Sequence, residues 1–148
     1  MIRIAEITRN LTLGVTRLFT DLDMGYLTEF TLSSGRRVDV IGINPSGMIS
    51  VAEIKASIAD YKNDQKWPDY LEYCDYFYFA VTSDFQLSEI PTNHRCGLII
   101  ADKYGAEILQ PASFVKLSSA RRKSITLRFA RIASQKYQSL MKENIQTN

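Results

Sequence analysis

The chain of 148 residues has the length of one ordinary domain. Hydrophobic residues make up 45% of it and charged residues 23%, which excludes a disordered tail, a collagen-like fibre and a transmembrane bundle. The net charge of +2 conceals an asymmetry: residues 1–115 carry 10 Lys or Arg and 15 Asp or Glu, whereas residues 116–142 carry 8 basic residues and no acidic one. Such asymmetry indicates an anionic partner.

Cysteine and histidine usage restricts the chemistry further. Cys74 and Cys96 do not make a disulfide framework, and residues 1–10 lack the apolar segment of a secretion signal. The longest apolar stretches are far below the roughly 18 residues that span a bilayer. We therefore expect a cytoplasmic protein with reduced cysteines and no membrane partner. His94 is the single histidine, and a zinc site of His94 with the two cysteines would lack its fourth ligand.

The first third of the chain predicts one helix and three strands. Apolar residues recur at helical spacing over residues 2–20, although Gly14 weakens this prediction slightly. Strands are expected at Tyr26–Leu32, Arg37–Ile43 and Met48–Ala56, joined by tight turns. Such short connections favour an antiparallel meander, because parallel neighbours need a longer crossover.

The remaining chain predicts two further helical segments and a second group of strands. Asp60–Cys74 is polar and helix-like, and Pro68 must either kink it or break it into two pieces. Tyr76–Thr82 reads as a strand buried on both faces, residues 97–101 and 106–109 read as a hairpin, and Ser118–Lys142 reads as a long helix. The order predicts a single α/β layered domain over residues 1–148, with a mixed central sheet flanked by helices.

Charged residues inside the predicted meander are the most informative feature. Asp39 lies in one apolar strand, and Glu53 and Lys55 lie in the next, where an unpaired charge costs several kcal/mol. Because side chains at i and i+2 share a face, Glu53 and Lys55 project together, and Asp39 can reach the same face from the neighbouring strand. Glu29 on the first strand can reach this face as well.

This arrangement is suited to metal-assisted phosphodiester hydrolysis. Carboxylates with a backbone carbonyl make the oxygen-rich site that Mg²⁺ or Mn²⁺ prefers. A lysine beside the metal can orient a water and stabilise charge on a phosphate. The competing interpretation is a buried salt bridge of Lys55 with Asp39 or Glu53 that only holds the sheet together.

The same residues carry a family resemblance over nearly the whole chain. The chain resembles the MmcB-like DNA-repair family, within the PD-(D/E)xK nuclease superfamily, through its GRRVDV, EIK and DQKWPDY blocks, which are residues 35–40, 53–55 and 64–70. The resemblance implies a restriction-endonuclease-like fold and a role in repairing damaged DNA. It also implies that Asp39, Glu53 and the Ile54 carbonyl hold the metal and that Lys55 is the catalytic lysine. Val38 stands where the superfamily's motif has Pro. For the additional carboxylate that the resemblance implies, Glu29 on the first strand is expected, with Glu6 on the first helix as the alternative.

Residues after the EIK strand leave alternatives open. Helix position alone does not decide whether Gln65 or Lys66 faces the site, and Lys66 either assists the site or lies on a solvated helix face. Trp67 is expected to pack in the core rather than to stack on a DNA base. The aromatic run of residues 76–79 is likewise expected to be buried rather than a stacking platform.

The basic segment predicts phosphate contacts without sequence readout. The residues expected to make them are Arg121, Arg122, Lys123, Arg128 and Arg131. A stripe on another side of this helix is expected to face the core, and it consists of Phe129, Ala133, Tyr137 and Leu140.

These features together predict a metal-dependent DNA endonuclease acting in DNA repair, with Mg²⁺ or Mn²⁺ as cofactor and damaged or structured DNA as partner. The alternative is a module with the nuclease fold that cuts little and instead binds DNA or recruits a repair protein. The sequence leaves open a homodimer, the preferred DNA structure and the cut polarity.

Overall fold

The computed structural model describes residues 3–85 and 95–147 of the chain. It contains two compact units, Met1–Leu117 and Ser118–Asn148, which are described separately below. His94 lies outside the described residues. Within the described part, none of the helices is long and apolar enough to cross a membrane. That residues 1–148 form a single domain stays a prediction.

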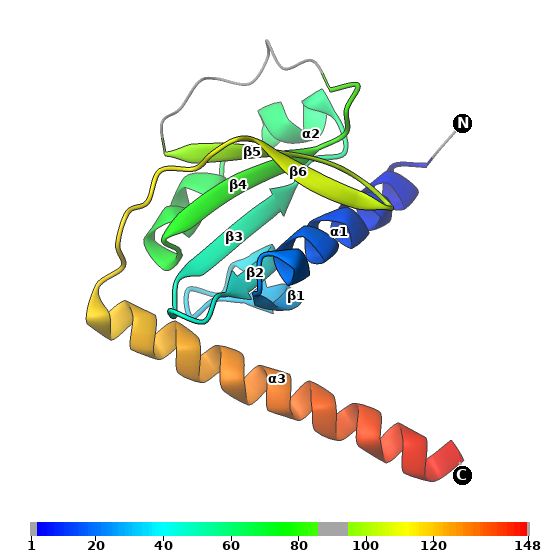
Figure 1. The fold of residues 1–148 in the computed structure, drawn as a ribbon, viewed down its shortest axis with the longest axis vertical. Helices are drawn as coiled ribbons and strands as arrows, with labels where there is room; N and C mark the ends of the chain where they lie inside the picture. The colour runs from blue at the N-terminus through cyan, green and yellow to red at the C-terminus, as the bar shows by residue number, and fades with distance from the viewer. Residues whose placement is uncertain (1–2, 86–94, 148) are drawn as a thin grey trace. The chain divides into compact units, whose positions relative to one another are not determined.

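The first unit is built on one six-stranded sheet (Figure 1). Its strands lie in the order of the chain and are β1 (Gly25–Thr31), β2 (Arg37–Ile43), β3 (Ile49–Ile54), β4 (Tyr76–Val81), β5 (Cys96–Asp102) and β6 (Gly105–Gln110). β1, β2 and β3 are antiparallel, β3, β4 and β5 are parallel, and β6 returns antiparallel to β5. The predicted meander, buried strand and hairpin are therefore confirmed, as is the mixed α/β layered class.

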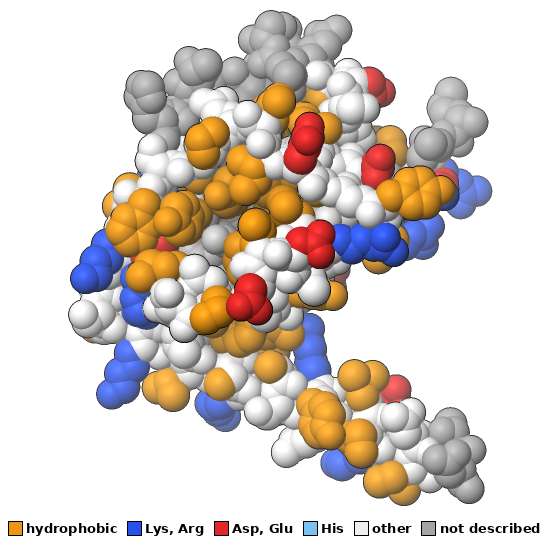
Figure 2. Space-filling model, in the orientation of Figure 1, with side chains coloured by type: hydrophobic (Ala, Val, Ile, Leu, Met, Phe, Trp, Pro, Cys, Tyr) orange, Lys and Arg blue, Asp and Glu red, His pale blue; other side chains and the backbone are white. Residues whose placement is uncertain are grey.

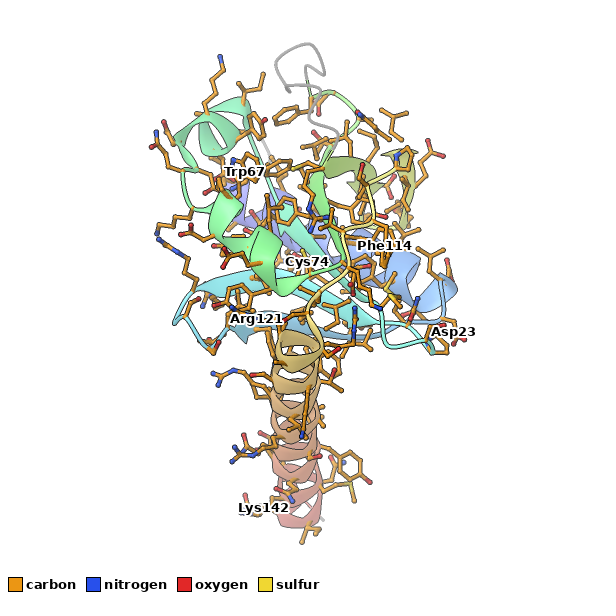
Figure 3. All side chains as sticks on the ribbon, turned by 90° about the vertical axis from the view of Figure 1, so that its left-hand side faces the viewer. Asp23, Trp67, Cys74, Phe114, Arg121 and Lys142 are labelled. Carbon is orange, nitrogen blue, oxygen red and sulfur yellow. The ribbon has the colours of Figure 1, made fainter. Side chains whose placement is uncertain are left out.

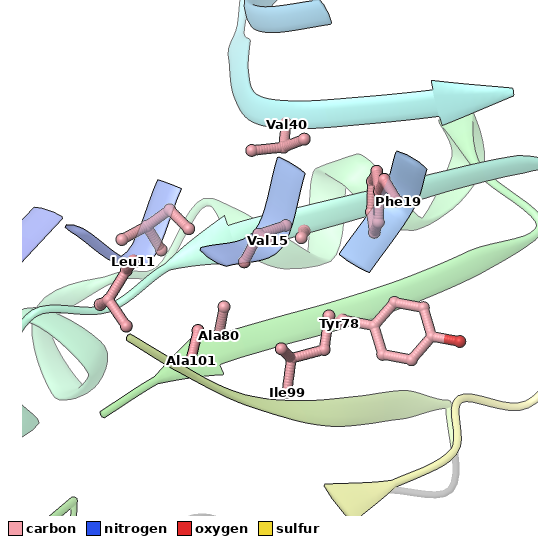
Figure 4. Packing of buried hydrophobic residues seen from close by; sticks show 10 residues of the cluster. Leu11, Val15, Phe19, Val40, Tyr78, Ala80, Ile99 and Ala101 are labelled. Atoms are coloured by element: carbon pink, nitrogen blue, oxygen red, sulfur yellow. The ribbon is translucent and has the colours of Figure 1, made fainter. Parts of the chain in front are cut away.

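Helix α1 (Ile4–Asp21) packs on one face of this sheet. Its Leu11, Val15 and Phe19 are at most 1% exposed, and they contact alternate residues of the strands, among them Val40 and Ile99 (Figure 4). Gly14 is essential to this packing, because a Cβ there would lie 2.1 Å from the Asp102 carbonyl oxygen. The glycine that weakened the helix prediction thus allows α1 to approach the β5–β6 hairpin.

The crossover between β3 and β4 covers the opposite face of the sheet. It consists of α2 (Ile58–Asn63) and the 3₁₀-helix η1 (Trp67–Tyr73), so Pro68 marks a break and restart at the beginning of η1. Trp67 stacks on Phe77 at a ring-centroid distance of 5.9 Å and meets Phe79 edge-on at 5.4 Å (Figure 3). Trp67 thus packs on the sheet as a half-buried residue, and Phe77, Tyr78 and Phe79 of β4 are buried as expected, whereas Tyr76 is only partly buried.

Local capping explains where α2 begins. The Ser57 side chain accepts a hydrogen bond from the Asp60 backbone N–H at 3.1 Å, and the Asp60 carboxylate accepts one from the Ala56 backbone N–H at 3.2 Å. This reciprocal arrangement satisfies amide groups that a helix N-terminus leaves unpaired. It also fixes the chain direction directly after Lys55.

The second unit contains the helix α3 (Ser119–Thr147). Basic side chains lie along it together with hydrophobic ones (Figure 2), and Arg121 and Lys142 mark its two ends in Figure 3. Tyr137 and Leu140 are 63% and 59% exposed. The prediction that their stripe faces a core is therefore wrong for these two residues, because a unit made of one helix has no core of its own.

Candidate active site

The strands β2 and β3 separate beyond Val40 and Ala52, and this point, the β2–β3 fork, places the two predicted carboxylates side by side. The last backbone pair of this ladder joins Val40 to Ala52, so the next register position sets Asp39 opposite Glu53. There the backbone pairing gives way to side chains: Glu53 Oε1 accepts the Asp39 N–H at 3.0 Å, and Asp39 Oδ2 accepts the Ile54 N–H at 2.8 Å. Each carboxylate is thereby held by the backbone of the strand that carries the other.

Burial gives this pair unusual electrostatics. Glu53 is only 5% exposed, and burial together with the nearby Asp39 charge raises the pKa of Glu53 to about 9. Burial also raises the pKa of Asp39, against the opposing effects of the Ile54 N–H and the Lys55 charge. Two carboxylates in one apolar setting strongly favour a shared proton or a bound cation.

Lys55 follows directly, but its partner is a residue that the sequence did not indicate. Its Nζ lies 2.5 Å from Asp64 Oδ2, and both side chains are buried, with exposures of 6% and 10%. The competing interpretation, a salt bridge of Lys55 with Asp39 or Glu53, is therefore wrong about the partner, which is Asp64. The signal that could have indicated Asp64 is local: an Asp three residues before a helix start can accept backbone N–H bonds, here from Lys66 and Trp67 at the start of η1.

The Asp64 carboxylate is poised to stay ionised. Its burial alone would favour the neutral acid, but the Lys55 hydrogen bond and the two backbone N–H groups lower the pKa of Asp64 below its usual value. The negative charge of Asp64 directly offsets the positive charge of the Lys55 ammonium. Lys55, held in place by this contact, is suited to orient a ligand and to stabilise negative charge.

These groups open onto a surface hollow of about 450 Å³. Both Gln65 and Lys66 line this hollow, so neither of the two alternatives is turned away from it. The lining residues are Thr8, Arg37, Asp39, Glu53, Ile54, Lys55, Asp60, Asn63, Asp64, Gln65, Lys66 and Tyr70. The hollow therefore combines an acidic floor with basic and neutral polar groups.

The structure does not bring the predicted additional carboxylate to this hollow. Glu29 is exposed and does not line this hollow, because its left-handed backbone, with a φ of 52°, interrupts the β1–β2 register at the position opposite Asp39. Glu6 lines a different hollow of about 640 Å³ beside Asp84 and Asp102. Asp60 and Asp64 are the further acidic residues at the Asp39–Glu53 hollow.

The donor set is compatible with a hard divalent cation. Asp39 and Glu53 supply carboxylate oxygens, which Mg²⁺ prefers while keeping several waters. Among the described residues, no group of three or more His, Cys, Asp or Glu side chains is arranged to hold a metal. Cys74 and Cys96 are buried free thiols, and His94 is not described, so the structure adds nothing to the zinc alternative.

The residues predicted to contact phosphate all lie on α3. Lys123, Arg128 and Arg131 are exposed, whereas Arg121 and Arg122 are partly buried. Their contact with DNA stays a prediction.

The fold and this site define a layered α/β domain whose sheet carries a buried acidic pair and a paired lysine at the end of β3. A family model described as DNA repair protein MmcB-like matches residues 2–144. The chain therefore belongs to the MmcB-like DNA repair protein family. The solved structure of a protein of unknown function from Silicibacter pomeroyi is similar, with a TM-score of 0.86, 39% identity, and coverage of 93% of this chain and 92% of that one. No curated protein matches the chain.

Proposed function

We propose that this protein is a metal-dependent DNA endonuclease of the PD-(D/E)xK superfamily that acts in DNA repair. The observation that carries the proposal is the reciprocal Asp39–Glu53 pair at the β2–β3 fork, with Lys55 directly beyond it. Buried acidic pairs of this kind are costly to keep unless they bind a proton or a cation. Membership in a DNA repair family makes a nucleic acid the natural substrate.

Asp39, Glu53 and the Ile54 carbonyl would hold Mg²⁺ or Mn²⁺. Such an ion supplies a water of lowered pKa and neutralises charge on the phosphate. The Lys55 ammonium, held in place by Asp64, would orient the attacking water and stabilise the negative charge that builds on the phosphate. Lys66 at the edge of the hollow would assist, and the basic residues of α3 would contact the DNA backbone.

A second candidate is a DNA-binding or partner-recruiting module that cuts little. One observation favours it: among the described residues, no group of three or more His, Cys, Asp or Glu side chains is arranged to hold a metal, so Asp39 and Glu53 form only a pair. It is also favoured by the existing engagement of Lys55 with Asp64. The two candidates differ in whether Asp39 and Glu53 bind a divalent cation.

Cleavage assays test the endonuclease directly. The full chain is incubated with Mg²⁺ or Mn²⁺ and with duplex, nicked, gapped and branched DNA, beside Lys55→Ala and Asp39→Ala. We expect both substitutions to abolish cleavage, whereas Glu29→Ala, outside the hollow, leaves it intact. Cleavage that survives Lys55→Ala and Asp39→Ala refutes the proposal. Calorimetric titration of Mn²⁺ against the wild type and Asp39→Asn separates the two candidates, because the module predicts no binding to either.

A further inference from the structure

We infer that Arg37 and Lys66 form a phosphate-binding pair at the rim of the Asp39–Glu53 hollow and hold a nucleic-acid backbone over the acidic floor. This inference rests on the proposed function and assigns a binding role to two residues of the first unit. It is independent of the basic residues on α3. Both side chains line the hollow and both belong to exposed residues.

Strand geometry directs Arg37 toward the carboxylates. Arg37 begins β2 two residues before Asp39, so both side chains project from the same face of the sheet. Within the described residues Arg37 forms no salt bridge, whereas its neighbour Arg36 is bound to Asp69 at 2.7 Å and does not line the hollow.

Lys66 is positioned by the residue that positions Lys55. The Asp64 carboxylate accepts the Lys66 backbone N–H through Oδ1 at 2.7 Å and the Lys55 ammonium through Oδ2 at 2.5 Å. The Asp64 carboxylate therefore fixes both the buried Lys55 ammonium and the backbone of Lys66, whose side chain is exposed. No salt bridge of Lys66 is present in the part of the chain that the structure describes.

The charge of the hollow explains why a rim of cations is needed. Four carboxylate residues line it, namely Asp39, Glu53, Asp60 and Asp64, and the single buried cation Lys55 is already paired. Carboxylates of this floor that hold neither a proton nor a cation repel a phosphate backbone, and cations at the rim offset that repulsion. Arginine and lysine contacts to phosphate position a nucleic acid without reading its sequence. The pair thus specifies the ligand as a phosphodiester backbone.

The test measures binding and does not depend on cleavage. A short fluorescein-labelled duplex and the corresponding single strand are titrated with the full chain in Ca²⁺, over a series of salt concentrations, and fluorescence anisotropy reports the affinity. We expect Arg37→Ala and Lys66→Ala each to weaken binding about tenfold and to reduce the slope of log affinity against log salt by roughly 0.7–0.9. Arg37→Lys should restore most of the affinity, because it retains the charge.

The chain offers a matched control for each variant. Arg36→Ala removes the same charge one residue away, and Lys62→Ala removes a lysine on α2 that does not line the hollow. We expect both controls to bind within about twofold of the wild type. Equal losses for Arg36→Ala and Arg37→Ala, or an unchanged salt slope for Arg37→Ala and Lys66→Ala, overturn the inference. If Arg37→Ala and Lys66→Ala weaken binding as expected but the wild type does not cleave DNA with Mg²⁺ or Mn²⁺, only the endonuclease proposal is refuted.

Discussion

The Lys55–Asp64 pair is expected to be among the most sensitive points of the fold. The perturbation is Asp64→Asn, which keeps the side-chain oxygen that accepts the Lys66 and Trp67 N–H groups and removes the negative charge. The Lys55 ammonium, 6% exposed, then loses its counter-charge. Glu53 cannot replace it at neutral pH, because its raised pKa of about 9 leaves it protonated.

The magnitude follows from the burial of both partners. Removing one member of a buried ion pair costs roughly 3–5 kcal/mol, and we expect the lower end, about 3 kcal/mol, because asparagine still accepts hydrogen bonds. For a protein of this size that corresponds to a fall in Tm of roughly 6–12 °C. The matched control is Asp69→Asn, whose pair with Arg36 has side-chain exposures of 57% and 39% and should contribute less than about 1 kcal/mol.

Urea unfolding followed by Trp67 fluorescence measures both variants. Trp67 is the single tryptophan and packs on Phe77 and Phe79, so its emission reports the integrity of the layer that carries Asp64. The double variant Lys55→Met/Asp64→Asn should lose less stability than the two single variants together, because it removes both charges. An Asp64→Asn loss no larger than that of Asp69→Asn refutes this reasoning.

Three further predictions concern other buried groups. Glu53 binds a proton in the folded state up to about pH 9 and releases it near 4.5 when unfolded, so the metal-free protein should lose stability as pH rises through that window. Urea midpoints across pH should show this slope in the wild type, and a slope that persists in Glu53→Gln contradicts it. Asp75→Ala should cost about 3 kcal/mol by urea unfolding, since it strands two buried N–H groups at 2.7 and 3.0 Å, those of Ile49 and Leu117; a loss below about 1 kcal/mol would contradict that accounting. Burial raises the pKa of Cys74 to about 12 and of Cys96 to about 11, so neither thiol should react with a thiol reagent at neutral pH until the protein is unfolded.

The sequence alone was sufficient for the order of the elements, because helix and strand periodicities are local properties. It was also sufficient for the Asp39–Glu53 pairing. The tight turn between β2 and β3 fixes an antiparallel register, and that register sets the two residues opposite each other. The hydrogen bonds that hold the pair were not predictable, because they exist only where the strands separate.

Glu29 shows that the alternation of residues along a strand does not always predict where a side chain lies. The β1–β2 register does bring it level with Asp39, as the alternation of residues predicts. A single left-handed backbone conformation at Glu29 interrupts the ladder there, and the residue remains exposed and outside the hollow. A non-glycine residue in that conformation is uncommon, and nothing in the local sequence indicated it.

The sequence by itself determined the unequal distribution of charge, the mixed sheet and the strand positions of Asp39 and Glu53, because composition and short-range periodicity encode them; Lys55, expected inside the same strand, lies directly after the end of β3. Only the tertiary structure decided that Lys55 pairs with Asp64 and that Arg37 and Lys66 share its hollow. The physical reason is the path of the crossover between β3 and β4. Packing of the crossover's Trp67 on Phe77 and Phe79 of the sheet brings Asp64 back over the end of β3. No local sequence pattern predicts that path.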